Sequence, residues 1–389
     1  MIRVLLLAGH TIQALPVLES LKSAGYFVVV ECETTQSYGY FSRYPDKRVV
    51  KPSCEYSSPE YLDFVLDCIS ENAIDIIIPL FDLSAEFVSR NRDVLLQRVK
   101  LAMPPYEEFL NGYSKNRLMD LCREHGFPHP ATMSVTPGNV SEAAGATGFP
   151  ALIKPDITTG GRGMTLVRSV DEIESVLPGI LNEYGSCTLQ EFIPPGGRQF
   201  KIHHFRTASG NCVGSVVVEK LRYYPVNAGS SCCNRTIDFP ELSLLTENVL
   251  HRLEWEGFAD FDMIEDPRDG SIRIMEINPR FPASVKSAFK AGVDYAGMYV
   301  DYCMGRPLKE YSCRSGVYLR YLGLDLMWFL KSPARFQADP SWFRFFGRDV
   351  FYQEGGWRDP MPFLFGSWSG MKKLLDQNFR KSKSGVRLD

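Results

Sequence analysis

Two kinds of segment are missing from this sequence of 389 residues. No apolar stretch approaches 18 residues, so the sequence predicts no membrane-spanning helix. A C-x-x-C pair is also missing, because the ten cysteines are scattered along the chain. Scattered cysteines of this kind are typical of small core residues in a reducing compartment, and we expect a cytoplasmic protein.

Charge of one sign is also scarce, because the net charge is only -3 and the pI is near 6.1. Such a chain has no overall field that would hold nucleic acid, and any basic site must be local. The dinucleotide fingerprint G-x-G-x-x-G is absent as well, which argues against a nicotinamide dehydrogenase. Small molecules are therefore the expected partners.

The length predicts more than one packed unit. Residues 1–112 alternate short apolar runs with amphipathic stretches, which favours an α/β domain with an open parallel sheet. Residues 113–310 read as an α+β region in which antiparallel strands dominate, with a helix over 114–125 capped by Ser114. Residues 311–389 form an aromatic-rich C-terminal extension that contains four of the five tryptophans.

The stretch "GSIRIMEINPRF" places Glu276, Asn278 and Arg280 at alternate positions of an apolar strand, so the three side chains share one face. A three-residue loop from Arg268 to Gly270 would set Asp262 opposite Glu276, with the two Cβ atoms roughly 5 Å apart. Facing carboxylates repel unless a cation lies between them. Carboxylate and amide oxygens suit Mg²⁺, with Mn²⁺ as an alternative. The other interpretation is an exposed strand face whose charges pair with lysines.

A second pattern, "IKPDITTGGRGMTLV", places Lys154 on a strand before a glycine-rich loop that leads into another strand. Glycines let backbone N–H groups approach phosphate oxygens. The loop lacks the Walker spacing and does not open a helix, so alone it also fits a flexible hairpin turn.

The order of these motifs is more specific than any one of them. A lysine on a helix, a lysine before a glycine-rich hairpin, "LQEFI" and the acidic hairpin ending in "MEINPR" follow one another. With this order the sequence resembles the ATP-grasp superfamily, most closely the branch of carbamoyl phosphate synthase, biotin carboxylase and many carboxylate–amine ligases. The resemblance implies an ATP-grasp module over 113–310, with a lid subdomain over 113–187 and a larger subdomain over 188–310.

Position by position, the resemblance also implies roles for individual residues. Asp262, Glu276 and Asn278 fall on the metal positions, and Arg280 matches an arginine that holds the transferred phosphoryl group or the substrate carboxylate. Lys154 would act beside Arg280, and Gln199 stands where the family usually has an acid for the ribose. The implied nucleotide-binding positions are Lys115, Lys154, Thr159, Gly160, Gly161, Gly163, Gln190, Glu191, Phe192, Ile193 and Gln199.

The implied activity is an ATP- and Mg²⁺-dependent ligase that activates a carboxylate as an acyl phosphate and joins it to an amine. Two alternatives stay open: bicarbonate or carbamate phosphorylation of the carbamoyl phosphate synthase type, and a nucleotide-binding regulatory protein without turnover. Arg222, in the segment "EKLRYYPVNAGSSCCNR", is expected to bind the acceptor carboxylate, although a solvated surface arginine would look the same in sequence.

The C-terminal extension allows two interpretations. Its rings could pack onto the module as an added layer of core. Alternatively, the segment 328–389 could form a semi-exposed apolar surface that contacts a membrane or a lipid-linked substrate weakly, aided by basic residues near the end of the chain. A homodimer is a further expectation.

Overall fold

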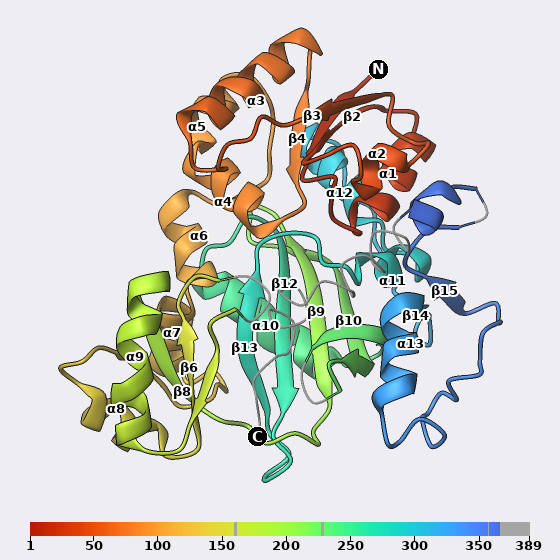
Figure 1. The fold of residues 1–389 in the computed structure, drawn as a ribbon. Helices are drawn as coiled ribbons and strands as arrows, with labels where there is room; N and C mark the ends of the chain where they lie inside the picture. Colours follow the sequence, from red (N-terminus) through yellow and green to blue (C-terminus); the bar gives the residue numbers. More distant parts are fainter. Residues whose placement is uncertain (159–161, 227–228, 357, 366–389) are drawn as a thin grey trace.

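The computed structural model describes residues 1–158, 162–226, 229–356 and 358–365, and in them the chain forms three sheets. In Figure 1 the N-terminal unit lies at the top, a small antiparallel sheet lies at the lower left, and a seven-stranded sheet fills the centre and right. The predicted α/β class is confirmed for the N-terminal unit, and the predicted antiparallel strands are found in the other two sheets. No helix among these residues has the length and apolar character needed to cross a bilayer.

The N-terminal unit is a four-stranded parallel sheet in the order β3-β2-β1-β4. Two helices, α4 (Asp82–Arg90) and α5 (Arg92–Leu96), are separated at Asn91, whose side-chain Nδ2 donates to the Phe87 carbonyl at 2.9 Å at the end of the first helix. The elements are β1 (Arg3–Leu7), α1 (Ala14–Ser23), β2 (Phe27–Cys32), α2 (Tyr38–Phe41), β3 (Lys47–Val50), α3 (Pro59–Glu71), β4 (Ile76–Pro79), α4 (Asp82–Arg90), α5 (Arg92–Leu96) and α6 (Tyr106–Tyr113).

The small sheet has the order β5-β8-β6-β7, and its pairings are antiparallel. Ser114 caps the helix before it as predicted, because its hydroxyl accepts a hydrogen bond from the Arg117 backbone N–H at 3.2 Å. The elements are α7 (Lys115–His125), β5 (Thr132–Val135), α8 (Val140–Thr147), β6 (Ala151–Pro155), β7 (Thr165–Val167), α9 (Val170–Tyr184) and β8 (Cys187–Glu191).

The large sheet has the order β13-β12-β9-β10-β11-β14-β15 and is antiparallel except for its last pair. Its last two strands come from beyond residue 310, so the sheet continues into the segment that the sequence presented as an extension. The elements are β9 (Gln199–Arg206), β10 (Cys212–Tyr224), β11 (Ser230–Ile237), α10 (Pro240–Arg252), β12 (Gly257–Glu265), β13 (Ile272–Asn278), α11 (Val285–Lys290), α12 (Tyr295–Cys303), β14 (Tyr318–Arg320), α13 (Leu322–Lys331) and β15 (Val350–Tyr352).

The hydrophobic cores divide the molecule differently from the sheets. Two of the clusters combine residues of the N-terminal unit with residues of the large sheet; in one of them Leu5 and Phe261 belong to the same core. The third cluster, around Ile153 and Leu189, contains residues of the small sheet and its helices α8 and α9. The N-terminal unit and the large sheet are thus packed together, whereas the small sheet has its own core and joins them at its edges.

Candidate active site

The acidic hairpin forms with the predicted facing pair. Asp262 on β12 lies opposite Glu276 on β13, and Asp260 lies opposite Asn278. The register slips by one residue between Asp262 and Met263, so Met275 is an extra residue in β13, and Gly270 in the turn has the predicted left-handed conformation at φ +74°. The carboxylates of Asp260, Asp262 and Glu276 therefore gather on one face of the large sheet.

Two lysines pair with the aspartates of this acidic face. The Lys201 ammonium lies 2.7 Å from Asp260 Oδ2 and 2.7 Å from Asp262 Oδ2, and the Lys220 ammonium lies 2.6 Å from Asp262 Oδ1. Both lysines come from the neighbouring strands β9 and β10. The lysine pairing that the sequence left as an alternative is therefore present at Asp262.

The pKa values of the two aspartates on this face are shifted in opposite directions. Burial raises the pKa of Asp260 to about 6, despite the nearby Lys201. Burial would raise the pKa of Asp262 too, but Lys201 and Lys220 together hold it well below its usual range. Asp262 is thus ionised at neutral pH, whereas the pKa of Asp260 lies close to neutral pH.

Glu276 differs from both aspartates. It is half-buried, and among the described residues no hydrogen bond or ion pair of its carboxylate is recorded. Asn278 Nδ2 donates to Asp262 Oδ2 at 3.0 Å, which joins two of the three predicted metal ligands. A carboxylate without a cation, facing an ionised Asp262, is the position on this face where an added cation is most needed.

Arg280 continues the same face. Its Nη2 donates to Asn278 Oδ1 at 3.0 Å, and its guanidinium is bound by the buried carboxylate of Asp82, with Nε 3.1 Å from Oδ1. Asp82 begins α4 directly after the parallel strand β4, at the edge of the sheet where α/β folds place ligands. The N-terminal unit thus contributes a side chain to this site.

The small sheet supplies the facing wall. Lys154 on β6 is buried and donates from Nζ to Gln190 Oε1 at 2.6 Å, and the Lys115 ammonium donates to the Asp156 carbonyl at 3.0 Å. Burial lowers the pKa of Lys154 to about 8, while the charges of Glu276 and Asp262 act in the opposite direction. The effect of Glu276 and Asp262 on this pKa means that the Lys154 ammonium is close enough to the acidic hairpin for an electrostatic interaction.

The end of β8 connects the two walls. The Glu191 carboxylate lies 2.7 Å from Arg273 Nη1 and also pairs with Arg268, and both arginines belong to the hairpin of β12 and β13. An open cavity of about 790 Å³ is lined by Glu191 and Arg273 together with residues of α7, β5 and α8, on a side that Lys154 does not line. We name the contact of Glu191 with the two arginines the hinge tie.

The remaining nucleotide-binding positions are placed as follows. Phe192 and Ile193 follow β8 and are half-buried, and the Phe192 backbone N–H donates to the Pro150 carbonyl at 3.3 Å. Gln199 begins β9 opposite Lys220. Gly163 has φ +72°, and a Cβ there would lie 2.7 Å from both Pro155 Cγ and a Tyr184 ring carbon, so glycine is required at this position. Thr159, Gly160 and Gly161 lie outside the described residues.

The expectation for Arg222 needs correction. Its guanidinium is buried and pairs with the Asp325 carboxylate of α13, with Nε 2.7 Å from Oδ1 and Nη2 3.0 Å from Oδ2. Its Nη1 donates to the Pro340 carbonyl at 2.9 Å. Arg222 does bind a carboxylate, but one from the chain itself, since β10 changes register around Leu221 and Arg222 faces α13.

Three residues of this site were missed from the sequence: Lys201, Lys220 and Asp260. Strand alternation could have found two of them. Asp260 stands two positions before Asp262 in "FADFD", and Lys201 lies on an alternating strand directly paired with Asp262. Lys220 depends on which strands become neighbours, and no local pattern shows that. Asp82 follows the strand "DIIIPLF", which predicts either a position beside a ligand or a helix cap, and it pairs with Arg280.

Comparison with known proteins supports the resemblance. The family described as "Carbamoyl-phosphate synthase L chain, ATP binding domain" matches residues 115–311. The carbamoyl phosphate synthase large chain of Methanoculleus marisnigri is 25% identical over 224 residues, which cover 55% of this chain and 21% of that protein. The chain therefore spans about a fifth of the length of this curated relative.

Solved structures share the fold over a longer part of the chain. The biotin carboxylase domain of 2-oxoglutarate carboxylase from Hydrogenobacter thermophilus, a dimer in complex with MgADP and bicarbonate, has a TM-score of 0.68 at 15% identity and covers 81% of this chain and 73% of that one. An L-amino acid ligase from Bacillus licheniformis has a TM-score of 0.62 at 16% identity and covers 82% and 78%. At these identities the likeness concerns the fold.

Proposed function

The chain belongs to the family of the carbamoyl-phosphate synthase L chain ATP-binding domain, and from that membership we propose that it is an ATP-dependent ligase that joins a carboxylate to an amine. One observation carries the proposal: the buried Lys154 of the small sheet lies within electrostatic reach of the facing carboxylates Asp262 and Glu276 of the large sheet. Cationic and acidic groups on two facing walls are what a bound metal–nucleotide complex needs.

The donor set fits magnesium. Glu276 and Asp262 offer carboxylate oxygens and Asn278 an amide oxygen, which are the ligands that Mg²⁺ or Mn²⁺ accepts. Magnesium held by these residues would neutralise negative charge on the nucleotide phosphates. Because Lys201 and Lys220 hold Asp262 in the metal-free protein, metal binding at Asp262 requires that these two ammonium groups release its oxygens.

The proposed reaction proceeds in two steps. A carboxylate oxygen of the substrate attacks the γ-phosphorus of ATP, and the bond from that phosphorus to the β-bridging oxygen breaks, which gives an acyl phosphate and ADP. An amine then attacks the acyl carbon and inorganic phosphate leaves. Lys154 and Arg280 are proposed to hold the transferred phosphoryl group, and Lys115 and the loop Thr159–Gly163 the other phosphates.

The positions proposed for the adenine and the ribose lie at the end of β8 and the start of β9, where the small sheet joins the large sheet. Gln190, Glu191 and the backbone of Phe192 and Ile193 would meet the adenine, and Gln199 the ribose. Gln190 already accepts from Lys154, so an arriving γ-phosphate would compete with it for the ammonium group. Arg222 is left out of this proposal because Asp325 occupies its guanidinium.

Domain roles follow from the same proposal. Residues 113–187 are proposed to move as the lid, and residues 1–112 and 188–310 to form the body on which it closes. The separate core of the small sheet supports such a division, but this core extends to Leu189 on β8, and α7 packs into the core of the body through Leu118 and Met119. The ten cysteines are all free, which supports the proposed cytoplasmic location. We further propose a homodimer, which light scattering of the purified protein would test.

Hydroxylamine trapping tests the reaction. The protein is incubated with Mg²⁺, ATP, hydroxylamine and a panel of carboxylic acids and amino acids, and ADP and hydroxamate are measured; we expect both to form with at least one acid. A parallel reaction with bicarbonate and ammonia tests the carbamoyl phosphate type of activity. Mg²⁺-dependent ATP binding without ADP formation under any condition would contradict the ligase and favour a regulatory protein.

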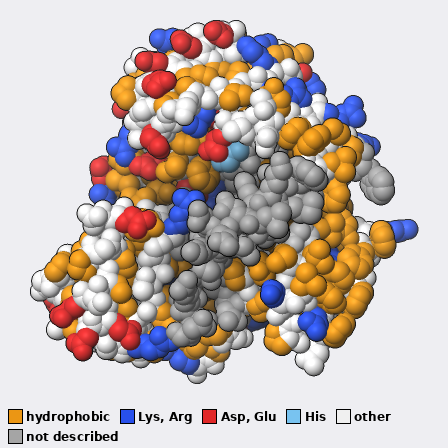
Figure 2. All heavy atoms as spheres, viewed as in Figure 1, with side chains coloured by type: hydrophobic (Ala, Val, Ile, Leu, Met, Phe, Trp, Pro, Cys, Tyr) orange, Lys and Arg blue, Asp and Glu red, His pale blue; other side chains and the backbone are white. Residues whose placement is uncertain are grey.

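We also propose a weak contact of the C-terminal part with an anionic lipid surface. Figure 2 shows hydrophobic side chains gathered on the side of the molecule where α13 and the segment after it lie. The exposed fractions are 90% for Phe346, 73% for Phe336 and 57% for Phe343, and Arg335 packs over the ring of Phe336. Exposed rings beside cations are typical of peripheral membrane contacts.

A further inference from the structure

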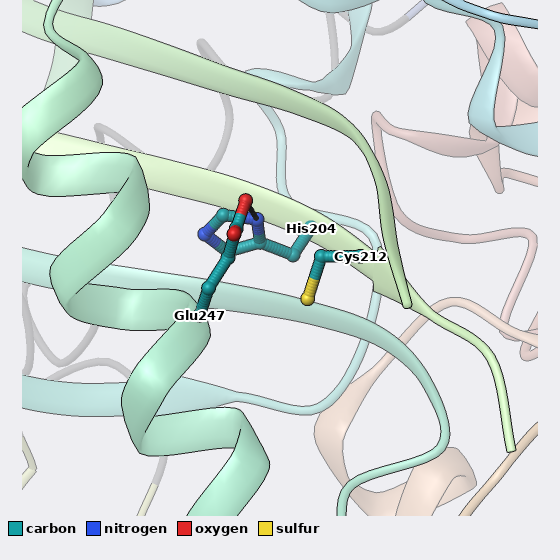
Figure 3. Close-up of side chains that lie close together, drawn as sticks. All are labelled: His204, Cys212 and Glu247. Atoms are coloured by element: carbon teal, nitrogen blue, oxygen red, sulfur yellow. Dashed lines mark ion pairs between the residues drawn. The ribbon is translucent and has the colours of Figure 1, made fainter. Parts of the chain in front are cut away.

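Three side chains with metal-binding atoms converge on the other face of the large sheet, under α10. Figure 3 shows His204 on β9, Cys212 at the start of β10 and Glu247 on α10 directed toward one another. The imidazole nitrogen, the thiol sulfur and a carboxylate oxygen all lie within 4.8 Å of one another, and His204 Nδ1 is 3.9 Å from Glu247 Oε1. We propose that these three residues bind a zinc ion.

The chemistry of the donors favours zinc. A thiolate and a carboxylate supply two negative charges and a neutral imidazole supplies none, so the set neutralises one divalent cation. Mixed nitrogen, sulfur and oxygen ligands are the set that Zn²⁺ accepts in a tetrahedral site, whereas Mg²⁺ prefers oxygen alone. On binding, the Cys212 thiol would lose its proton to solvent, without any change of oxidation state.

The surroundings of His204 agree with a ligand role. Burial lowers the pKa of His204 to about 3, so the ring is neutral at physiological pH and can offer a lone pair. Its Nε2 lies 2.6 Å from Thr246 Oγ1, and Thr246 in turn donates to the Leu242 carbonyl at 2.8 Å. When Thr246 donates to that carbonyl, Nε2 carries the ring proton and Nδ1 is the acceptor directed toward Glu247.

When His204 carries its proton on Nε2, the single hydroxyl proton of Ser215 has two possible acceptors, His204 Nδ1 and Glu247 Oε1. Its hydroxyl lies 2.9 Å from His204 Nδ1 and 2.9 Å from Glu247 Oε1. Without zinc, the other tautomer completes the series of hydrogen bonds, because Nδ1 donates to the Ser215 hydroxyl and that hydroxyl donates to Glu247. Zinc would instead select the Nε2–H tautomer and use the Nδ1 lone pair directly, with the Ser215 hydroxyl then donating to Glu247.

The backbone is irregular at this point. β10 changes register between Val213 and Val216, opposite the segment of β9 that contains His204, and Gly214 in the bulge has φ +69°. Bulges of this kind redirect side chains and are frequent beside functional sites. Burial and the Glu247 carboxylate raise the pKa of the Cys212 thiol to about 12, while the positive charge of Arg206 acts in the opposite direction, so a zinc ion would have to displace the thiol proton.

The accessible ligands make the site reachable. The Glu247 side chain is 35% exposed and Cys212 is half-buried, while His204 is fully buried. Zinc would join α10 to β9 and β10 behind the acidic hairpin. Because Lys201 and His204 lie on one strand, the ion would stiffen the strand whose opposite face carries the candidate active site.

Cobalt substitution tests the proposal on the full-length protein. The metal-free protein, kept in excess Mg²⁺ to fill oxygen-ligand sites, is titrated with Co²⁺. We expect one cobalt per chain to give the near-ultraviolet charge-transfer band of a thiolate–cobalt bond, and Zn²⁺ to displace it. Zn²⁺ is also expected to raise the midpoint of thermal unfolding.

Variants decide whether this cluster is the site. Cys212→Ser should remove the band, and Glu247→Gln should weaken Zn²⁺ affinity at least tenfold, whereas Cys303→Ser, at another half-buried cysteine, should change neither. Circular dichroism and thermal melting check that each variant folds. A protein that gives no thiolate band, or variants that bind Co²⁺ and Zn²⁺ as tightly as the original, would overturn the proposal and leave a metal-free hydrogen-bonded chain.

Discussion

Two carboxylates, Asp262 on β12 and Asp325 on α13, are each held by two cations, yet they differ in what a ligand could do there. Asp262 is bound by Lys201 and Lys220 on a face that also carries the unpaired Glu276. Asp325 is bound by Arg222 and Arg320, with Arg320 Nε 2.8 Å from Oδ2. The first group has an excess of acid that a metal can satisfy, whereas the second is complete by itself.

The choice of cation explains the difference. Both arginines at Asp325 are buried, use their planar forks, donate to backbone carbonyls as well and stack on rings, Arg222 over Trp328 and Arg320 over Phe345. A lysine ammonium is a point charge on a flexible stem and can turn to another anion. Lysines beside Asp262 can therefore be exchanged for a metal, while the arginines beside Asp325 fix the C-terminal part to the sheet.

The largest effect is expected at the arginine cluster. Asp325→Asn leaves two buried guanidinium groups without their carboxylate, which should lower the free energy of unfolding by about 3–5 kcal/mol. Chemical denaturation measures it. Asp63→Asn on the exposed face of α3 is the matched control, with an expected change below about 0.5 kcal/mol. Equal stability of the two variants would show that the cluster does not hold the C-terminal part.

The opposite outcome is expected at the acidic hairpin. Glu276→Gln should reduce Mg²⁺-dependent ADP formation by about 100-fold, or roughly 2.7 kcal/mol, because one charged oxygen ligand is lost. Its melting temperature without metal should stay level or rise, since the repulsion from Asp262 is relieved. Glu265→Gln at the end of β12 serves as the control. A large fall in melting temperature with turnover intact would make Glu276 a structural residue.

A smaller effect concerns Lys154. Its pKa in the folded protein is about 8, below the usual 10.5, so the folded protein binds fewer protons than the unfolded chain between these values and its stability rises with pH there. Nucleotide phosphates need the charged form, so ATP affinity should fall about tenfold from pH 7 to pH 9. Calorimetric titration in two buffers measures the proton uptake. Lys154→Arg should bind ATP without this pH dependence; a pH-dependent variant would assign the proton to another group.

The smallest effect is expected on the C-terminal surface. Co-sedimentation with vesicles of anionic lipid should be detectable at low salt and lost at high salt, because a few cations give only weak attraction. Replacing Phe336 and Phe346 with serine should abolish it, and replacing the exposed Leu244 on α10 should not. Absence of binding at low salt would leave the exposed rings without a lipid contact.

Much of the fold could be predicted from local pattern. Strand alternation led to the facing of Asp262 and Glu276, but the predicted three-residue loop was wrong. Glu265 pairs with Ile272, so the turn is one residue longer, and the bulge at Met275 restores the predicted pairing. Parallel strands and helix ends in the N-terminal unit were predictable because apolar runs and caps are local signals. The predicted metal ligands come from one hairpin, which is why the sequence could bring them together.

The rest depends on long-range neighbours. Arg222 was misassigned because its partner Asp325 lies 103 residues further along the chain, on a helix that docks beside β10. For the same reason Lys220 was missed, since it reaches Asp262 from a strand 42 residues earlier in the chain. Asp82 was predicted from its place after a strand, but its pairing with Arg280 depends on the packing of separate units. Burial and sheet order, which decide the partner of a charged side chain, are properties of the assembled fold.

The hinge tie bears on the rate at which the small sheet could separate from the large sheet. Each ion pair between Glu191 and the two arginines is partly exposed, and such pairs contribute about 0.2–1 kcal/mol. Contacts this weak rupture and re-form easily, so they would add little to the barrier for swinging the small sheet away from the large one. Their re-formation would return the end of β8 to the same two arginines each time the small sheet closes. The rate of product release would then be set by groups other than Glu191.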